Sequence, residues 1–163
     1  MKKKIITLIF LLLTLMWMCV IFSFSCENAS ESSESSGSFI EKIASVIIKD
    51  FDTFSEEEKT VFIERYEHFT RKAAHFTIYA ILGALSFTTV FSYSSAYKKS
   101  YFIALIIGAL YAVSDEIHQY FVPGRACMIK DMLLDSCGVA FGAAVILLFV
   151  FIIRKKHSKS IKS

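Results

Sequence analysis

Acids and bases crowd into a short stretch of the chain between two apolar segments. Residues 111–135 hold four acids, one histidine, one glutamine, one arginine, one lysine and the only proline of the sequence. The segments on either side, 101–113 and 132–153, are mostly apolar. A turn between two apolar helices needs polar residues, but not this density of charge. Ionisable groups at the edge of membrane-length helices are candidates for function by default, so this stretch is the first candidate for a site.

A second polar group opens an earlier apolar segment. Arg71, His75 and Tyr79 are spaced by four residues. On a helix they therefore stack along one face, with neighbouring Cβ atoms about 5–6 Å apart. The same spacing puts Asp115 and Gln119 on a common face of another helix. Two helices would thus each present a polar face at one of their ends.

These residue types indicate acid–base chemistry or the binding of an anion. We expect His75 to act as a general base, with Asp115 or Glu116 orienting its ring as the catalytic partner. Arg125 would hold a phosphate or carboxylate through a two-pronged contact. The expected ligand is a membrane-bound molecule with a polar head. The residues assigned to substrate binding are Arg71, Tyr79, Gln119, Arg125 and Asp131.

Two other interpretations of the cluster stay open. One is an ion-pair network in which Arg125 bridges Asp131 or Glu116, because buried charges need such partners. The other is a divalent metal held by His75, His118 and carboxylates. The sequence contains no H-E-x-x-H motif and no C-x-x-C spacing, so we expect neither a metal nor another cofactor.

The surrounding elements are those of a membrane protein. The chain has 163 residues, of which 55% are hydrophobic, and a mean hydropathy of +0.53. A spanning helix needs about 20 mostly apolar residues. We therefore expect a single all-α domain over residues 1–163, an integral membrane bundle of four transmembrane helices rather than a soluble bundle. The predicted spans are residues 5–24, 73–93, 101–118 and 132–153.

Basic residues predict the orientation of this bundle. The segments 1–4, 94–100 and 154–163 hold 10 of the 18 basic residues and none of the 15 acids. Cytoplasmic loops are enriched in Lys and Arg, so both termini are expected in the cytoplasm. Residues 25–72 and 119–131 then lie outside, with the polar cluster at the outer boundary. The net charge of +3 follows from this topology and does not indicate nucleic-acid binding.

The segment after the first span predicts two short amphipathic helices within residues 38–70. Residues 25–38 contain no bulky apolar side chain and are expected to form a solvated linker. Capping boxes at Ser38–Glu41 and Ser55–Glu58 each precede apolar residues at helical spacing. These helices are expected on the outer leaflet or over the outer mouth of the bundle. The length of the first apolar run favours a retained helix over a cleaved signal peptide. The sequence F-S-F-S-C ending at Cys26 weakly resembles a lipoprotein cleavage site, and lipidation of Cys26 stays open. Cys26 and Cys127 both lie outside, where they could pair.

Small residues recur at four-residue spacing in three of the spans. Such residues let membrane helices approach closely, so they predict a tight bundle. They are Ala80, Gly83 and Ala84 in the second span, Ala104, Gly108 and Ala112 in the third, and Gly138 and Gly142 in the fourth.

Three ordered motifs resemble those of the VanZ-like family. They are R-K-A-A-H-F-T-I-Y-A-I-L-G at 71–83, D-E-I-H-Q-Y-F-V-P-G-R at 115–125 and D-M-L-L-D-S-C-G-V-A-F-G at 131–142. The resemblance covers roughly residues 61–150. His118 falls at a position that the pattern leaves open, and Asp135 stands where many members have Asn. The matching positions are Arg71, Lys72, His75, Tyr79, Gly83, Asp115, Glu116, Gln119, Phe121, Arg125, Asp131, Gly138 and Gly142.

The resemblance implies a multi-pass protein of a bacterial cytoplasmic membrane that alters susceptibility to glycopeptides of the teicoplanin type. Its expected partners are the lipid bilayer and a lipid-linked cell-wall precursor or a lipoglycopeptide, with no nucleic acid. The site would bind or alter one of these molecules. Two alternatives are a membrane-embedded hydrolase or transferase that uses His75 with Asp115 or Glu116, and a non-catalytic assembly partner in the envelope. The oligomeric state is left open.

Overall fold

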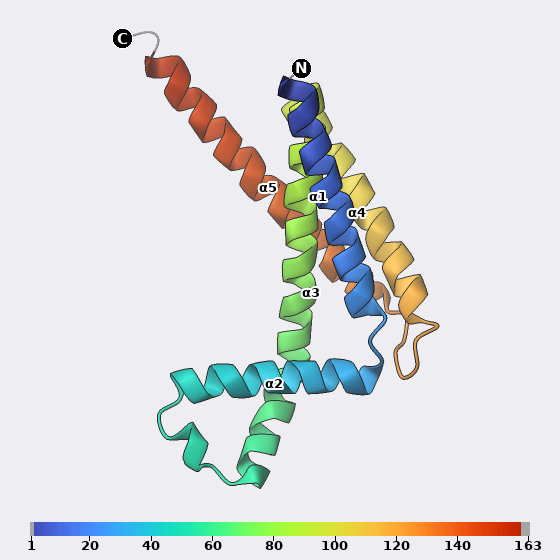
Figure 1. Ribbon diagram of the computed structural model, residues 1–163, viewed down its shortest axis with the longest axis vertical. Coiled ribbons are helices and arrows are strands. Elements are labelled where there is room, and N and C mark those ends of the chain that lie inside the picture. The colour runs from blue at the N-terminus through green and yellow to red at the C-terminus, as the bar shows by residue number, and fades with distance from the viewer. Residues whose placement is uncertain (1, 161–163) are drawn as a thin grey trace.

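Helices account for all the regular structure of residues 2–160, the part of the chain that this computed structural model describes; side chains are described for residues 2–156. Four of these helices are long and apolar enough to cross a membrane, which confirms the predicted all-α class and the four spans (Figure 1). The elements are α1 (Lys2–Ser25), α2 (Ala29–Ile47), the 3-10 turn η1 (Phe51–Thr53), α3 (Glu56–Ser94), α4 (Tyr97–Gln119) and α5 (Ile129–Ser160).

The exterior of the bundle is apolar. On α1, the side chains of Leu8 and Leu12 are 55% and 57% exposed. The core between the helices includes Ile21, Tyr79, Leu82, Ala112 and Val139. An exposed apolar surface of this extent has to be shielded from water. Lipid chains shield it in a membrane.

Glycines bring α3 and α5 into close contact. An ideal Cβ on Gly142 would lie 1.8 Å from the carbonyl oxygen of Ala80, and one on Gly83 would lie 2.1 Å from that of Val139. Neither position has space for a side chain. In Figure 1, α5 crosses α3 at this level, and the C-terminal half of α5 leans away from the other helices. The crossing confirms the tight packing predicted from these small residues.

The small face of α4 turns into the bundle as well. Ala104, Gly108 and Ala112 are all buried. A Cβ on Gly108 would meet the side chain of Val139 at 2.5 Å. Because α4 has only small residues on this face, the bulkier Val139 of α5 fills the space between the two helices.

The basic segments gather at one end of the bundle. Lys2 and Ser160 both lie there (Figure 1). The Lys3 Nζ atom donates a hydrogen bond to Ser95 Oγ at 3.1 Å, and the Arg154 guanidinium lies 4.9 Å from the centre of the Phe91 ring. Arg154 also lies 5.3 Å from the centre of the Tyr97 ring, so described residues of all three basic segments are neighbours in space.

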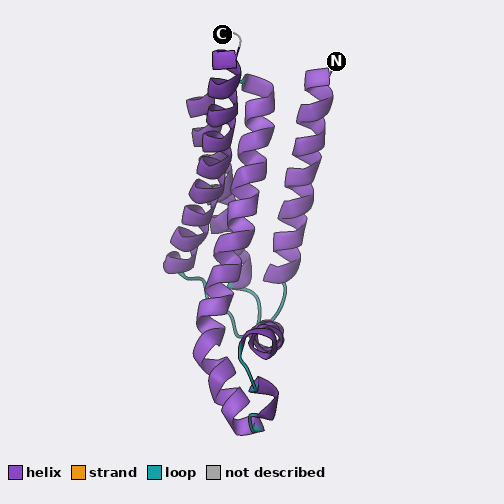
Figure 2. Cartoon of the chain, turned by 90° about the vertical axis from the view of Figure 1, so that its left-hand side faces the viewer, coloured by secondary structure: helices purple, strands orange, loops and turns teal. Residues whose placement is uncertain are grey.

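The predicted start of the first amphipathic helix was wrong. Helix α2 begins at Ala29, inside the segment expected to be a solvated linker, and its capping box pairs Asn28 with Glu31 instead of Ser38 with Glu41. Gly37 and Ile40 of this helix are buried. Packing against the bundle therefore makes this serine-rich stretch helical, although its composition alone favours coil. Helix α2 lies across the bundle and appears end-on in Figure 2.

The second amphipathic helix is not a separate element. Its predicted cap is confirmed, because the Glu58 amide donates to Ser55 Oγ at 3.3 Å and the Ser55 amide donates to the Glu58 carboxylate at 2.8 Å. The helix then runs on without a break for 39 residues to Ser94. No Gly or Pro stands between this amphipathic stretch and the apolar span. The start of α3 consequently projects beyond the bundle (Figure 2).

Candidate functional site

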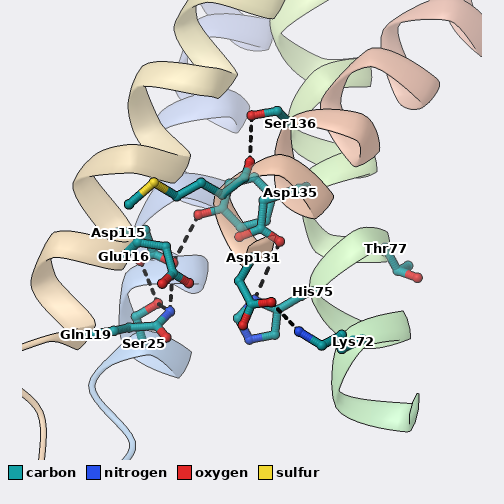
Figure 3. A network of polar contacts seen from close by, with 12 residues as sticks. Ser25, Lys72, His75, Thr77, Asp115, Glu116, Gln119, Asp131, Asp135 and Ser136 are labelled. Carbon is teal, nitrogen blue, oxygen red and sulfur yellow. Dashed lines mark hydrogen bonds and ion pairs between the residues drawn. The ribbon is translucent and has the colours of Figure 1, made fainter. Parts of the chain in front are cut away.

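The C-terminal ends of α1 and α4 and the turn that joins α4 to α5 lie at the end of the bundle remote from the two termini (Figure 1), and the polar residues meet there. Their side chains come from α1, α3, α4 and α5 and from the turn that joins α4 to α5. Figure 3 shows Asp115 and Gln119 on α4 facing Ser25 of α1, with His75 of α3 beneath Asp135 of α5. The three helices expected to converge do converge, and α1 joins them.

Asp115 is the centre of a buried hydrogen-bond network. Ser25 Oγ donates to its Oδ1 atom at 2.5 Å, and the Tyr79 hydroxyl and Gln119 Nε2 donate to Oδ2 at 3.0 Å and 3.1 Å. Asp115 itself is 3% exposed. Donors on both oxygens offset the cost of burying the carboxylate. The network ties α1, α3 and α4 together at one level.

Arg125 is held in the turn beside this network. Gly124 adopts a positive φ of 75°, which a glycine allows without strain, and the Arg125 amide donates to the Val122 carbonyl at 3.1 Å. The Arg125 Nη1 atom donates to Gln119 Oε1 at 3.3 Å. Burial, followed by the nearby charge of Arg71, lowers the pKa of the Arg125 guanidinium. The group nevertheless stays protonated, because the ordinary pKa of arginine is above about 12.

Glu116 fixes the start of α5. Its Oε2 atom accepts a hydrogen bond from the Met128 amide at 2.8 Å, and the side chain is fully buried. Its Oε1 atom has no hydrogen-bond partner among the described side chains. This contact locks the turn between α4 and α5 in place.

His75 faces Asp135 rather than the acids expected to orient it. The His75 Nδ1 atom lies 3.6 Å from Asp135 Oδ1, slightly beyond hydrogen-bond distance. Asp135 is wholly buried. Within residues 2–156, neither of its carboxylate oxygens has a hydrogen-bond partner. In the described structure, Asp115 and Glu116 make no hydrogen bond or ion pair with His75.

Two further ion pairs border the site. The Lys72 ammonium contacts Asp131 (Figure 3), and the Arg71 guanidinium contacts Glu67, one turn earlier on α3. Arg71 also donates to Ser33 Oγ of α2 at 3.2 Å. The ion-pair alternative had Arg125 as the bridge, but the pairs that form use Lys72 and Arg71.

Two cavities open at this level. A polar cavity of about 260 Å³ is lined by Ala29, His68, Arg71, Lys72, His75, Gln119, Gly124, Arg125, Ala126, Met128, Asp131 and Leu134. A more apolar groove of about 670 Å³ is lined by parts of α1, α2 and α3 together with Glu27 and Arg125. Three side chains, Arg71, His75 and Arg125, line both. The lining of the polar cavity contains three fixed cations, Arg71, Lys72 and Arg125, and a single acid, Asp131.

The structure divides the residues selected from the sequence into two sets. Arg71, His75, Gln119, Arg125 and Asp131 line the polar cavity. The other three do not line either cavity and lie in the layer behind it, where they bind protein groups. They are Tyr79, Asp115 and Glu116.

Three residues at the site were not selected from the sequence. Lys72 is adjacent to Arg71 in the first motif, and its charge was a usable signal. Asp135 had a helical register that placed it one turn from Asp131. Ser25 gave no signal, because it begins a serine-rich segment in which no serine is distinguished from the others.

Cysteines and metal ligands make no further site in the described part of the chain. Cys26 and Cys127 are both free and exposed, and Cys26 Sγ lies 3.5 Å from His118 Nε2. Between residues 2 and 156, no three His, Cys, Asp or Glu side chains are grouped so that they could hold a metal ion.

Comparison with known proteins places the chain in a family. The family model described as VanZ/LLP1 matches residues 10–151, a range that includes α2, α3, α4, most of α1 and α5, and every residue of the polar cavity. Neither the curated proteins nor the solved structures yield a match. Because the matched range covers most of the sequence, the chain belongs to the VanZ/LLP1 family of membrane proteins.

Proposed function

We propose that the protein acts at the outer face of a bacterial cytoplasmic membrane, with both termini in the cytoplasm. There it modulates susceptibility to glycopeptides of the teicoplanin type. It does so through the polar cavity, which binds or alters a lipid-linked envelope component or the drug itself. Family membership supports the cellular role, and the cavity supports the mode of action.

The observation that carries this proposal is the basic lining of the polar cavity. Arg71, Lys72 and Arg125 contribute three fixed positive charges from α3 and from the turn before α5. Of the acids nearby, Asp131 pairs with Lys72 and Glu67 pairs with Arg71. A structural ion-pair network would pair every charge, yet Arg125 lies within ion-pair distance of no described carboxylate. A cationic pocket of this kind suits an anionic group.

Separate substitutions at three positions test the proposal. We expect Arg125→Gln to accumulate normally in the membrane and to abolish the effect on glycopeptide susceptibility, because it removes a charge of the cavity and no ion pair. We expect His75→Gln to weaken the effect. Glu116→Ala should lower the amount of protein, since it frees the Met128 amide. Immunoblotting of membranes and minimum inhibitory concentrations provide the two readouts.

Lys98→Gln is the matched control for the loss of a positive charge, since Lys98 is exposed at the opposite end of the bundle. It should leave both readouts unchanged. If all three site variants fail to accumulate, the cluster is structural and the proposal fails. The proposal also fails if Arg125→Gln accumulates and leaves susceptibility at the wild-type value.

A membrane-embedded hydrolase or transferase is the second candidate. The sequence assigned His75 as the base with Asp115 or Glu116, and the proximity of His75 to Asp135 favours Asp135 as the acid that orients the ring. Comparing the membrane lipids of cells with and without the wild-type protein separates binding from chemistry. A lipid species that is lost or gained only with intact His75 would support the enzyme. An unchanged lipid profile would favour binding alone, whether of a lipid or in a non-catalytic assembly role.

A further inference from the structure

We propose that the ligand is a membrane lipid that ends in a phosphate group. The phosphate occupies the polar cavity, and the hydrocarbon chain lies in the apolar groove beside it. This inference rests on the proposed function and specifies the chemistry of the ligand for the same site.

The first argument is that the two cavities are joined. Arg71, His75 and Arg125 line both the polar cavity and the groove. A molecule bound to these side chains therefore has a basic compartment on one side and an apolar one on the other. The groove of about 670 Å³ falls within the range of about 300–1,000 Å³ found for ligand sites. Only an amphiphile fills both compartments.

The second argument is the unmet hydrogen-bonding capacity of the two arginines. The buried Nε atom of Arg71 has no acceptor among the described side chains. Among the described residues, the Arg125 guanidinium makes one side-chain hydrogen bond, to the neutral Gln119 amide oxygen at 3.3 Å. Two guanidinium groups face one cavity and repel each other, so an anion between them is stabilised by both. Guanidinium forks match phosphate oxygens in pairs.

The third argument concerns the acids of the site, which are already engaged. Asp131 contacts Lys72, Asp115 accepts three side-chain hydrogen bonds, and Asp135 faces His75. None of these three acids lies within ion-pair distance of Arg125, whereas Arg71 is paired with Glu67. A terminal phosphate offers three acceptor oxygens, one more than a phosphodiester leaves free. The number of available donors therefore favours a terminal phosphate over an ordinary diester lipid head.

The lining of the groove suits a hydrocarbon chain. Small residues on one side of α3, Ala73, Ala74 and Thr77, form part of its wall and leave space between the helices. Phe24 of α1, Phe39 of α2 and Phe69 of α3 form its apolar rim. These three phenylalanines are 51%, 57% and 71% exposed. Because these lining side chains are exposed, we infer that a hydrocarbon chain enters the groove between them.

A fluorescence titration tests this assignment on the full-length protein. Trp17 is the only tryptophan, and its indole Nε1 atom donates to the carbonyl of Ile78, a residue of the groove wall, at 2.8 Å. Its emission is thus a local reporter of an occupied groove. The protein is placed in nanodiscs of neutral phosphatidylcholine and titrated with farnesyl phosphate, farnesol or inorganic phosphate. We expect saturable binding of farnesyl phosphate, with at least about tenfold weaker responses to the other two.

Two variants separate the head from the chain. Losing one charge-assisted contact should weaken binding about 10- to 100-fold, so Arg125→Gln should bind farnesyl phosphate that much less tightly than wild type. Ala74→Leu, which fills the groove, should weaken farnesyl phosphate binding while the protein stays folded. Lys98→Gln and Ala144→Leu are the matched controls. Both positions are exposed and away from the cavities, so both variants should bind like wild type.

Three results would overturn the inference. Equal binding of farnesol and farnesyl phosphate would show that the site does not read the phosphate. Wild-type affinity in Arg125→Gln would show that the basic cavity does not hold it. Full competition by nanodiscs containing phosphatidylglycerol would show that any anionic lipid suffices. If farnesyl phosphate does not bind but Arg125→Gln still abolishes the effect on susceptibility, this inference fails and the proposed function stands.

Discussion

Asp115 and Asp135 are buried alike, yet their surroundings differ. Asp115 accepts hydrogen bonds from Ser25, Tyr79 and Gln119. Asp135 has one oppositely charged partner within ion-pair distance among the described residues, His75, at 3.6 Å. Breaking a buried pair by removing one partner leaves an uncompensated charge and is strongly destabilising. His75 is therefore expected to support Asp135 in addition to lining the cavities.

A double-mutant cycle measures this support. We expect His75→Leu to lower the free energy of unfolding by about 3–5 kcal/mol, because Asp135 is left without its partner. Asp135→Asn added to it should restore most of that loss, because the uncompensated charge is gone. Unfolding is followed by titrating micelles of the purified protein with a denaturing detergent.

His68→Leu is the control for the loss of an imidazole, since His68 is exposed, and it should leave the free energy of unfolding within about 0.5 kcal/mol of wild type. Additive effects of His75→Leu and Asp135→Asn would show that the two side chains are not coupled.

Among the elements, α3 and α5 determine where the site forms. Helix α3 carries Arg71 and His75, and α5 carries Asp135. The two helices cross at glycine positions, where no side chain separates their backbones. Gly138 also takes part, because an added Cβ there would lie 2.5 Å from the Phe76 carbonyl oxygen. A membrane supplies little hydrophobic drive for helix association, so close backbone packing has to provide it. The crossing consequently sets the distance between His75 and Asp135.

Adding one methyl group at this crossing tests its importance. Gly142→Ala would bring a Cβ to 1.8 Å from the Ala80 carbonyl oxygen, so the helices must separate. We expect a loss of about 1–3 kcal/mol in the free energy of unfolding, the usual cost of overpacking. Thermal melts of the detergent-solubilised protein measure it.

Gly37→Ala is the matched control on α2. Its Cβ would meet only a side-chain methyl of Ile63, at 3.3 Å, and replacing a helical glycine by alanine contributes up to about 1 kcal/mol of stability. This variant should melt at or above the wild-type temperature. Equal melting of Gly142→Ala and wild type would contradict the proposed role of the crossing.

The two ends of the molecule differ in character along its long axis. One end gathers the basic segments near Lys3, Ser95 and Arg154, and the other holds the site beneath α2. Helix α2 leaves an apolar face exposed, with Val46 at 84% and Ile47 at 74%. A helix of this kind that lies across a bundle is suited to the membrane interface. We expect α2 to rest on the outer leaflet, beside the opening of the groove.

Cysteine accessibility tests the orientation of the whole chain. In a variant without the four native cysteines, Glu34→Cys on α2 and Lys99→Cys at the basic end are each treated with a membrane-impermeant maleimide. Positive residues favour the cytoplasmic side, so Glu34→Cys should react in intact cells and Lys99→Cys only after permeabilisation. The opposite pattern would refute the topology. The cysteine-free parent provides the background.

The periodicity and charge pattern of the sequence determined the number of spans, the polar helix faces and the close packing of the helices. Long apolar runs specify four spanning helices, because only a helix satisfies its backbone hydrogen bonds in lipid. Helical spacing put Arg71, His75 and Tyr79 on one face, and the alternation of spans brought them to the end that carries Asp115 and Arg125. The small residues at four-residue spacing predicted the close approach of α3, α4 and α5.

Only the tertiary structure decided which side chains pair and where α2 begins. Helix α2 starts at Ala29 because packing against the bundle outweighs the weak helical preference of serines. His75 meets Asp135, and Lys72 meets Asp131, because the depth of the glycine crossing sets which turns of α3 and α5 face each other. The position of this crossing along the two helices depends on contacts between segments distant in sequence. The residue pattern within one helix therefore cannot predict it.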